Sequence, residues 1–585
     1  MKLLPEWIQS YRPSLLSGDL TAGLIVTVML IPQSLAYAML AGLPPEIGLY
    51  ASVLPLVVYA LVGSSMTLAV GPVAVASLMT ASALAPLATA GSADYIALAI
   101  QLSMLSGAML LVFGVLRLGF LAYFLSHPVI SGFISGSAVL ISISQLKHVF
   151  GIPASSGHVL QTLYDIVTHL PQANLATTTI GLLTLAFLFF ARKSLGTLLQ
   201  KTGLSAGTAG LLGRLAPMVA VILSIVAVGQ LNLAQEAGVR IVGEVPQGLP
   251  ALQFLVPSAN SVAALWLPAL LISLVGFVES VSVAQSLALK RQQKINPNRE
   301  LLGLGAANIA SAVSGGYPVT GGFARSVVNF AAGANTPLAG VISAVLMAIV
   351  IASMTGIFYN LPQAVLSATI IVAVTSLIDI KTIKETWHYD RADSLSLLAS
   401  LFGVVILGVE AGVILGVALS LAALVWRSSH PHIAIVGRVP GTEHFRNIKR
   451  HNVDTLPGLL ALRVDESLFF ANAALVQGKI ESLVATDAQI KFVLLLCPAV
   501  NQIDSTALEA LTQLQSSLEA KGITFMLAEV KGPVMDRLQP TELGHKLAGL
   551  IFLSAHDAFS YVEKQSGQRT RYAGHHCPDQ HGRLL

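Results

Sequence analysis

Long apolar runs separated by short polar stretches occupy roughly the first three quarters of the chain. Runs long enough to cross a hydrocarbon core of about 30 Å recur between Thr21 and Trp426. The predicted spans are residues 21–41, 47–63, 97–115, 126–146, 176–191, 213–230, 260–288, 338–355, 362–378, 393–408 and 411–426. This pattern predicts a multi-pass α-helical membrane protein.

Three further apolar stretches, 66–83, 300–314 and 320–335, are short or are interrupted by glycine and proline. Together with the long runs they give fourteen crossings or part-crossings. The interrupted stretches 66–83 and 320–335 take matching places in two halves, residues 1–235 and 255–430. Broken helices at corresponding places in two halves are typical of transporters built from inverted repeats.

The pattern changes after Arg427. Residues 493–500 and 523–530 have the length and composition of buried strands, and 456–470 indicates another strand pair. Helical spacing between the strands predicts a small α/β domain. The predicted domains are residues 1–430 for the transmembrane part, 431–565 for the α/β part and 566–585 for a disordered tail.

Composition and charge agree with this division. The 585 residues are 54% hydrophobic and 11% charged, against about 25% charged in a typical soluble domain. Residues 1–430 hold 18 basic and 14 acidic residues, whereas residues 431–585 hold 15 of each. A single soluble globule is therefore excluded, and neither part carries a basic patch that would indicate a nucleic-acid partner.

Basic residues also orient the chain. With the N-terminus inside, the inner loops carry fifteen Lys and Arg residues, whereas the outer loops carry only Lys147 and Arg240. Cytoplasmic loops are enriched in basic residues. We therefore expect both termini in the cytoplasm and a multi-pass location in a bacterial-type inner or plasma membrane.

Polar or glycine-rich strings interrupt the membrane segments at three places: residues 31–38, 69–74 and 318–326. In the first, Gln33 and Tyr37 lie four apart on one helical face behind a proline. The other two combine Gly and Pro before a short apolar helix, whose N-terminus would attract an anion. A kinked helix and a purely structural re-entrant loop are the alternatives for the first two strings.

Few charges lie at membrane depth. Arg325 falls in the first turn of the last short helix, where a guanidinium would suit oxyanion recognition. A structural salt bridge is the alternative. Of two acids at this depth, Glu279 lies in mid-span and must pair, protonate or face a cavity. Glu410 is expected at the turn between two spans.

Several strings together resemble the sulfate permease (SulP) family of anion transporters. In the membrane part the matching strings are residues 19–23, 32–38, 41–45, 48–50, 63–65, 70–72, 303–308 and 324–329. Residues 501–507, Asn-Gln-Ile-Asp-Ser-Thr-Ala, are similar to the STAS domain that usually ends these proteins. The resemblance covers nearly the whole chain.

The resemblance implies a seven-plus-seven inverted repeat with a core and a gate domain, usually as a homodimer. It places an anion between the N-termini of the third and tenth helices, beside the first and eighth. The residues so implicated are Gln33, Tyr37, Val73, Ala74, Phe323, Ala324 and Arg325 for the substrate and Glu279 for proton coupling. Some members have Ser at the position of Ala324.

In related STAS domains the serine after the aspartate can be phosphorylated, which corresponds to Ser505. An ordinary helix start explains the same string, because Asp504, Ser505 and Thr506 resemble a helix N-cap, with Thr506 and Glu509 spaced as a capping box. The remaining expectation for this domain is binding of a cytoplasmic protein partner or assembly.

The predicted function is secondary active transport of a small anion, with sulfate as the first candidate, by H⁺ symport or anion exchange. Bicarbonate, a C4-dicarboxylate and an anion channel of the same fold are the alternatives. No nucleophile–base pair, phosphate loop or metal-ligand spacing indicates an enzyme or a cofactor. His575, His576, Cys577 and His581 could bind a metal, but a solvated tail is the simpler interpretation.

Overall fold

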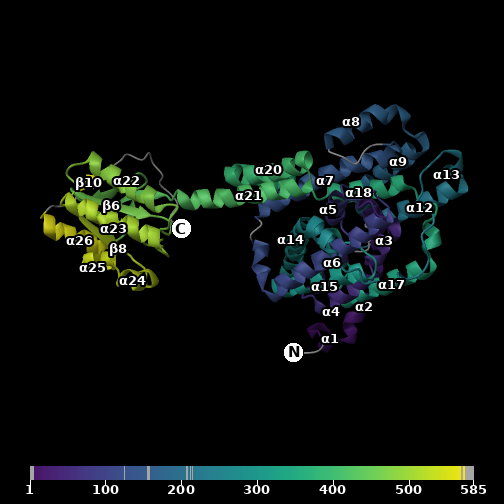
Figure 1. The fold of residues 1–585 in the computed structure, drawn as a ribbon, viewed down its shortest axis with the longest axis horizontal. Helices are drawn as coiled ribbons and strands as arrows, with labels where there is room; N and C mark the ends of the chain where they lie inside the picture. Colours follow the sequence, from purple (N-terminus) through teal and green to yellow (C-terminus); the bar gives the residue numbers. More distant parts are fainter. Residues whose placement is uncertain are drawn as a thin grey trace. The chain divides into compact units, whose positions relative to one another are not determined.

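A computed structural model describes residues 5–123, 126–153, 159–203, 205, 209–210, 213, 215–567 and 571–573. The chain forms two compact units, Met1–Ser420 and Leu421–Leu585. Figure 1 shows helices alone forming nearly all of the first unit and a sheet with helices on its faces in the second.

All fourteen predicted segments of the first unit are formed. They are α2 (Leu16–Leu40), α3 (Pro45–Tyr50) with α4 (Leu54–Val62), β1 (Val70–Gly71) with α5 (Ala74–Leu84), α6 (Ala93–Val115), α7 (His127–Phe150), α9 (Leu175–Phe190), α12 (Ala216–Gln230), α14 (Ala259–Leu289), α15 (Pro297–Val313), β2 (Thr320–Gly321) with α16 (Phe323–Ala331), α17 (Leu338–Ser353), α18 (Gln363–Thr375), α20 (Arg391–Leu407) and α21 (Val409–Ser429). Shorter helices connect them: α1 (Glu6–Gln9), α8 (Val159–His169), the π-helix η4 (Ala191–Leu195), α10 (Gly196–Lys201), α13 (Leu233–Glu236) and α19 (Ile380–Tyr389).

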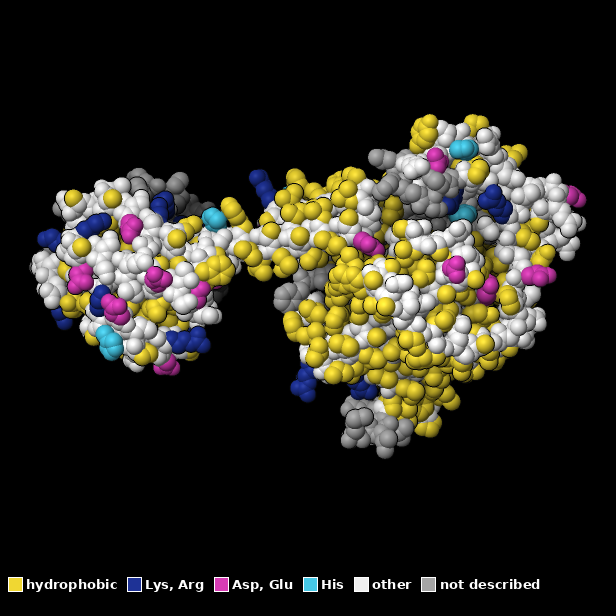
Figure 2. Space-filling view, viewed as in Figure 1, with side chains coloured by type: hydrophobic (Ala, Val, Ile, Leu, Met, Phe, Trp, Pro, Cys, Tyr) yellow, Lys and Arg dark blue, Asp and Glu magenta, His cyan; other side chains and the backbone are white. Residues whose placement is uncertain are grey.

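By length and apolar composition, eight helical stretches among the described residues are able to cross a membrane, and three more apolar helices are shorter. Large apolar side chains such as Leu183, Leu223 and Val345 lie on the outside of these helices. Figure 2 shows broad areas of hydrophobic side chains on this unit and few charges between them. Such a surface is typical of contact with lipid.

The helices of this unit pack in two groups. In the first group α15 contacts α4 and α6, while α2 contacts α16 and α17, and α14 contacts α5 and α6. In the second group α7 contacts α9, α18 and α20. These groups agree with the predicted core and gate. Small residues allow close packing, since a Cβ added at Gly107 would lie 2.8 Å from the carbonyl oxygen of Gly305.

The predicted turn at Glu410 is confirmed. Helix α20 ends at Leu407, and Gly408 has a φ of 99°, a conformation that favours glycine. Glu410 then lies in the first turn of α21. A carboxylate near a helix N-terminus interacts favourably with the free N–H groups there, and it needs no partner deep in the membrane.

The second unit is an α/β domain, as predicted. Its strands are β3 (Ile433–Arg438), β4 (Phe445–Asn447), β5 (Val453–Thr455), β6 (Leu459–Val464), β7 (Phe492–Leu496), β8 (Thr524–Ala528), β9 (Ile551–Phe552) and β10 (Arg571–Ala573), in the order β10-β5-β3-β6-β7-β8-β9 with β4 beside β3. Its helices are α22 (Ala473–Thr486), α23 (Ser505–Ala520), α24 (Gly532–Leu538), α25 (Glu542–Lys546) and α26 (Ala555–Ser566).

Two apolar clusters cover the two faces of this sheet. Strands β6 to β9 are parallel neighbours, and their side chains alternate between the clusters, as the two-residue period of a strand requires. Val493 and Leu495 pack with α22 and α23, whereas Leu494 and Leu496 pack with α26. Both faces are buried, which explains why these strands appear in the sequence as continuous apolar runs.

Two expectations for this unit are wrong. Residues 456–470 hold one strand of the sheet, β6, because the chain leaves the sheet after Val464 and returns only at a single bridge between Leu468 and Ile503. Within the predicted disordered tail, residues 571–573 form β10, whose backbone pairs with β5. The rest of that tail beyond Gly567, including the His and Cys residues, lies outside the described residues.

Cys497 tests the burial of the sheet in this α/β domain. It is 2% exposed directly after β7, and burial, with a smaller effect of the Glu529 charge, raises the pKa of its thiol to about 12. At pH 8 such a thiol is deprotonated in roughly one molecule in ten thousand. We expect a full-length Cys577→Ser variant to resist maleimide labelling at pH 8 until it is denatured, as read by mass spectrometry. Fast labelling of the native protein would contradict the buried position.

Candidate functional site

Two very short strands form a small sheet inside the first unit. Strands β1 and β2 pair in antiparallel fashion, with Val70 opposite Gly321 and Gly71 opposite Thr320. The N–H of Gly322 adds a bond of 3.0 Å to the carbonyl oxygen of Ala69. The two Pro/Gly breaks found in the sequence are therefore one structure, in which each break satisfies backbone groups of the other.

Each strand leads directly into a short helix. Val73 precedes α5 and Gly322 precedes α16, and neither helix start has a side-chain cap. The first intrahelical bonds run from Ser77 N–H to the Val73 carbonyl and from Ser326 N–H to the Gly322 carbonyl. The N–H groups before Ser77 and Ser326 are free of intrahelical bonds, so both helix starts are positively polarised.

Arg325 lies between the two helix starts. Its side chain is 2% exposed, and its Nη1 donates to the carbonyl oxygen of Pro72 at 2.7 Å. Its Nε and Nη2 are buried and have no hydrogen-bond partner. Within the described part of the chain Arg325 forms no ion pair, so the alternative of a structural salt bridge is not what the structure shows. A buried guanidinium with two free nitrogens is costly unless a ligand accepts from them.

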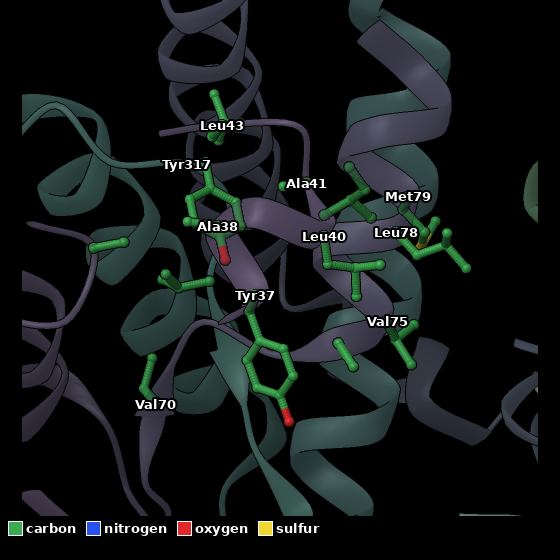
Figure 3. Packing of buried hydrophobic residues seen from close by; sticks show 14 of the residues in the cluster. Tyr37, Ala38, Leu40, Ala41, Leu43, Val70, Val75, Leu78, Met79 and Tyr317 are labelled. Carbon is green, nitrogen blue, oxygen red and sulfur yellow. The ribbon is translucent and has the colours of Figure 1, made fainter. Parts of the chain in front are cut away.

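A cavity of about 40 Å³ lies against this arginine. It brings together all eight residues predicted for substrate and proton: Gln33, Tyr37, Val73, Ala74, Glu279, Phe323, Ala324 and Arg325. They come from α2, α5, α14 and α16. Figure 3 shows Tyr37 extending from α2 into the region between Val70 of β1 and Val75 of α5.

The polar side chains around this cavity are free to bind. Gln33, Tyr37 and Glu279 make no hydrogen bond or ion pair with other residues that the structure describes. Glu279 and Tyr37 interact with Arg325 through charge alone. Pro32 lies inside α2, and the satisfied polar groups that the alternative at this proline requires are not observed, since Gln33 and Tyr37 lack partners among the described residues.

One wall of the cavity could not be predicted from the sequence. Ala373, Val374 and Leu377 line it from α18 and the residues just after it. Nothing marks them as site residues, because they lie in an ordinary apolar span. They matter because α18 packs with the second helix group. The cavity therefore lies where the two groups of helices meet.

A larger cavity of about 430 Å³ continues from the small one. The two share Gln33, Ala324 and Ala373 as lining residues. Arg192 of the π-helix η4 lines the larger cavity and donates to the carbonyl oxygen of Val372 at 3.1 Å. The larger cavity therefore adjoins the small one and has a basic residue in its lining.

Buried polar side chains hold the paired strands β1 and β2 in place. Ser280 Oγ accepts from Gly321 N–H at 2.8 Å, and Ser326 Oγ accepts from Ala69 N–H at 2.9 Å. Asn308 bonds both the N–H and the carbonyl of Val319, each at 2.9 Å. Asn308 and Ser326 belong to strings that carried the family resemblance, so that signal already pointed to them.

Two further buried acids were not expected. The sequence placed only Glu279 and Glu410 near membrane depth, but Asp19 and Glu300 are both 0% exposed. Each lies in the first turn of its helix, where a charge is normally assigned to a loop. Loops from the other half of the unit cover them, and the sequence pattern cannot show that coverage.

Ser505 lies elsewhere, in the second unit. It is the first residue of α23 and is exposed beside a cavity of about 190 Å³. The helix cap is Asp504, whose side chain accepts from Ala507 N–H at 2.8 Å. The predicted helix start at residues 504–506 is therefore confirmed, whereas the capping box of Thr506 and Glu509 is wrong because the helix begins before Thr506.

Comparisons with known proteins agree over nearly the whole chain. The model of the sulfate permease family matches residues 16–400, and that of the STAS domain matches residues 450–558. Sulfate transporter 4.1, a chloroplastic protein of Arabidopsis thaliana, is 36% identical over 538 residues, covering 89% of this chain and 76% of the relative.

Two solved structures have similar folds. The structure of SLC26A9 matches 97% of this chain and 93% of its own, with a TM-score of 0.88 at 22% sequence identity. The transmembrane domain of the cyanobacterial bicarbonate transporter BicA matches 69% of this chain and 98% of its own, with a TM-score of 0.59 at 25% identity. The chain belongs to the sulfate permease family of membrane anion transporters, which are not enzymes, and carries a C-terminal STAS domain.

Proposed function

We propose that the protein is a secondary active transporter of a small oxyanion, with sulfate as the principal substrate. The observation that carries this proposal is the guanidinium of Arg325, which is buried between two uncapped helix N-termini with two of its nitrogens unpartnered. Oxyanion oxygens would accept hydrogen bonds from these nitrogens and from the free N–H groups of α5 and α16.

The cavity favours an anion with one charged centre. Its volume is about 40 Å³, and among the described residues Arg325 is the only cation that lines it. A C4-dicarboxylate would bring a second charge without a second cation. Bicarbonate stays as the alternative substrate, because BicA shares the fold of the membrane unit. The sulfate transporter relative has higher identity over more of the chain, which favours sulfate.

Glu279 supports coupling to protons. It lines the same cavity as Arg325 without pairing with it. When Glu279 is ionised it competes with the anion for the positive charge, and when it is protonated that competition ends. Anion and proton would therefore bind together, which is symport. If the binding site could not re-orient across the membrane without a bound anion, the protein would instead exchange anions.

The two helix groups supply the moving parts. The cavity has walls from α2, α5, α14 and α16 on one side and from α18 on the other. Displacement of one group against the other would expose the anion to opposite sides of the membrane in turn. The excess of basic residues in one set of loops supports the proposal that both termini lie in the cytoplasm of a bacterial-type cell. Homodimer formation, a cytoplasmic partner of the STAS domain and phosphorylation of Ser505 stay predictions.

Arg325→Ala tests the anion site. Two charge-assisted hydrogen bonds of about 1.5–3 kcal/mol each correspond to a loss of roughly 100-fold or more in sulfate uptake, and Arg325→Lys should recover part of it. The measurement is radiolabelled sulfate uptake in proteoliposomes, with bicarbonate, chloride and succinate as competitors. Uptake by Arg325→Ala at the normal rate would disprove the assignment. Currents that grow linearly with voltage would indicate a channel instead.

Glu279→Gln tests proton coupling. The amide cannot take up a proton, so this variant should lose sulfate accumulation driven by an acidic outside while it keeps sulfate–sulfate exchange. Glu410→Gln is the matched control, because Glu410 lies at a turn and should leave accumulation unchanged. Normal pH-driven accumulation by Glu279→Gln would exclude this residue as the proton carrier.

Gly322→Ala tests how closely the site is built around Arg325. A Cβ at Gly322 would lie 3.0 Å from Arg325 Nη2 and 3.2 Å from Val73 Cγ1, so the guanidinium must shift. Because small displacements of a binding group are costly, we expect a loss of about tenfold or more in uptake. Gly356→Ala, whose Cβ would meet nothing closer than 3.8 Å, should transport normally. Equal uptake by both variants would contradict the tight packing.

A further inference from the structure

The segment that leads into β1 has no regular structure of its own. Helix α4 ends at Val62 with a last bond from Gly63 N–H, and β1 begins at Val70, so residues 64–68 have neither helix nor ladder bonds to fix them. Backbone N–H and carbonyl groups in a buried segment need partners. Those partners are Glu300 of α15 and Asn329 of α16, in the other half of the unit, and Ser65 within the segment.

Glu300 supplies the first of them. Its Oε1 accepts from Ser64 N–H at 2.8 Å, from Ser64 Oγ at 2.6 Å and from Ser65 N–H at 3.0 Å. Its Oε2 accepts from the hydroxyl of Tyr59 on α4 at 2.6 Å. Glu300 is 0% exposed, and no described cation forms an ion pair with it.

The hydrogen bonds continue from there to the anion site. Ser65 Oγ accepts from Thr67 N–H at 3.4 Å and from Leu68 N–H at 3.1 Å. Ala69 N–H donates to Ser326 Oγ, and β1 then pairs with β2. Directly after β1, the carbonyl oxygen of Pro72 accepts from Arg325 Nη1. Every link from Glu300 to Arg325 is a hydrogen bond or a peptide bond.

We propose that Glu300 is a positioning residue for the anion site. It holds residues 64–65 and thereby fixes the position of β1. The position of β1 in turn fixes that of the Pro72 carbonyl, which orients Arg325. The proposal rests on the proposed function in one respect, namely that Arg325 binds the anion. A carboxylate suits this task because it accepts at both oxygens and donates at neither, while four donors converge on it.

Asp19 provides a matched control within the same unit. It is also 0% exposed, and it accepts from Asn335 N–H at 2.6 Å, Thr336 N–H at 2.9 Å and Thr336 Oγ1 at 2.7 Å. The segment that it holds leads into α17, which contributes no residue to the small cavity. Loss of Asp19 therefore removes an equally buried carboxylate without loosening β1.

The test compares Glu300→Ala with Asp19→Ala in the full-length protein. Hydrogen–deuterium exchange should accelerate over residues 63–71 in Glu300→Ala and around residues 335–338 in Asp19→Ala. In proteoliposomes the KM for radiolabelled sulfate should rise about fivefold or more in Glu300→Ala only, which corresponds to about 1 kcal/mol. An unchanged KM in Glu300→Ala, or equal increases in both variants, would overturn the proposal.

Two milder variants keep the test decisive if Glu300→Ala does not fold. Glu300→Gln retains one accepting oxygen and should raise the KM less than alanine does. Ser65→Ala leaves the bonds of Glu300 intact but removes the acceptor for Thr67 and Leu68, so it should raise the KM as well. Normal KM values in both would overturn the proposal.

The exchange experiment does not depend on transport. If the wild-type protein takes up no sulfate, the proposed function fails, but faster exchange over residues 63–71 would still support the role of Glu300 in holding β1. If wild-type uptake is normal and exchange over residues 63–71 does not change in Glu300→Ala, the positioning role alone is wrong.

Discussion

Backbone hydrogen bonds between β1 and β2 make the rest of the membrane unit possible. A helix broken within a membrane leaves N–H and carbonyl groups that lipid cannot satisfy. Here two breaks occur, and each satisfies the other through the pairing of Val70–Gly71 with Thr320–Gly321. Because the strands are so short, the helices that follow begin next to each other. Their positively polarised ends then face one small space.

The electrostatics of the site follow from this arrangement. Arg325 is buried among groups that satisfy only one of its nitrogens, so the guanidinium is held ready for a ligand. Its positive charge adds to the two helix ends, while Glu279 opposes it from the same cavity. One cavity is therefore lined by both a buried cation and a titratable acid, the two groups on which the proposed function rests. Desolvation strengthens the electrostatic effects of both groups, because the interior screens charge far less than water does.

Much of this organisation was predictable from local sequence. Gln33 and Tyr37 share a helical face because they are four residues apart, and Gly and Pro before residues 74 and 323 indicate helix starts. An arginine within an apolar membrane segment is energetically costly and therefore rare, so Arg325 is easily recognised in the sequence. The STAS strands were recognisable where they are buried on both faces. The short edge elements β4, β9 and β10 were not, because they contain too few apolar residues to form a pattern.

The sequence by itself determined the class of membrane protein, the succession of segments and the residues that line the small cavity. These depend on hydrophobicity, helical period and single costly charges, which are local properties. Only the tertiary structure decided that α18 closes the cavity and that Asp19 and Glu300 are buried. The burial of Asp19 and Glu300 depends on contacts between the two halves, made by residues more than two hundred positions apart in the sequence. A carboxylate in a first turn has the same local pattern whether water or a distant loop covers it.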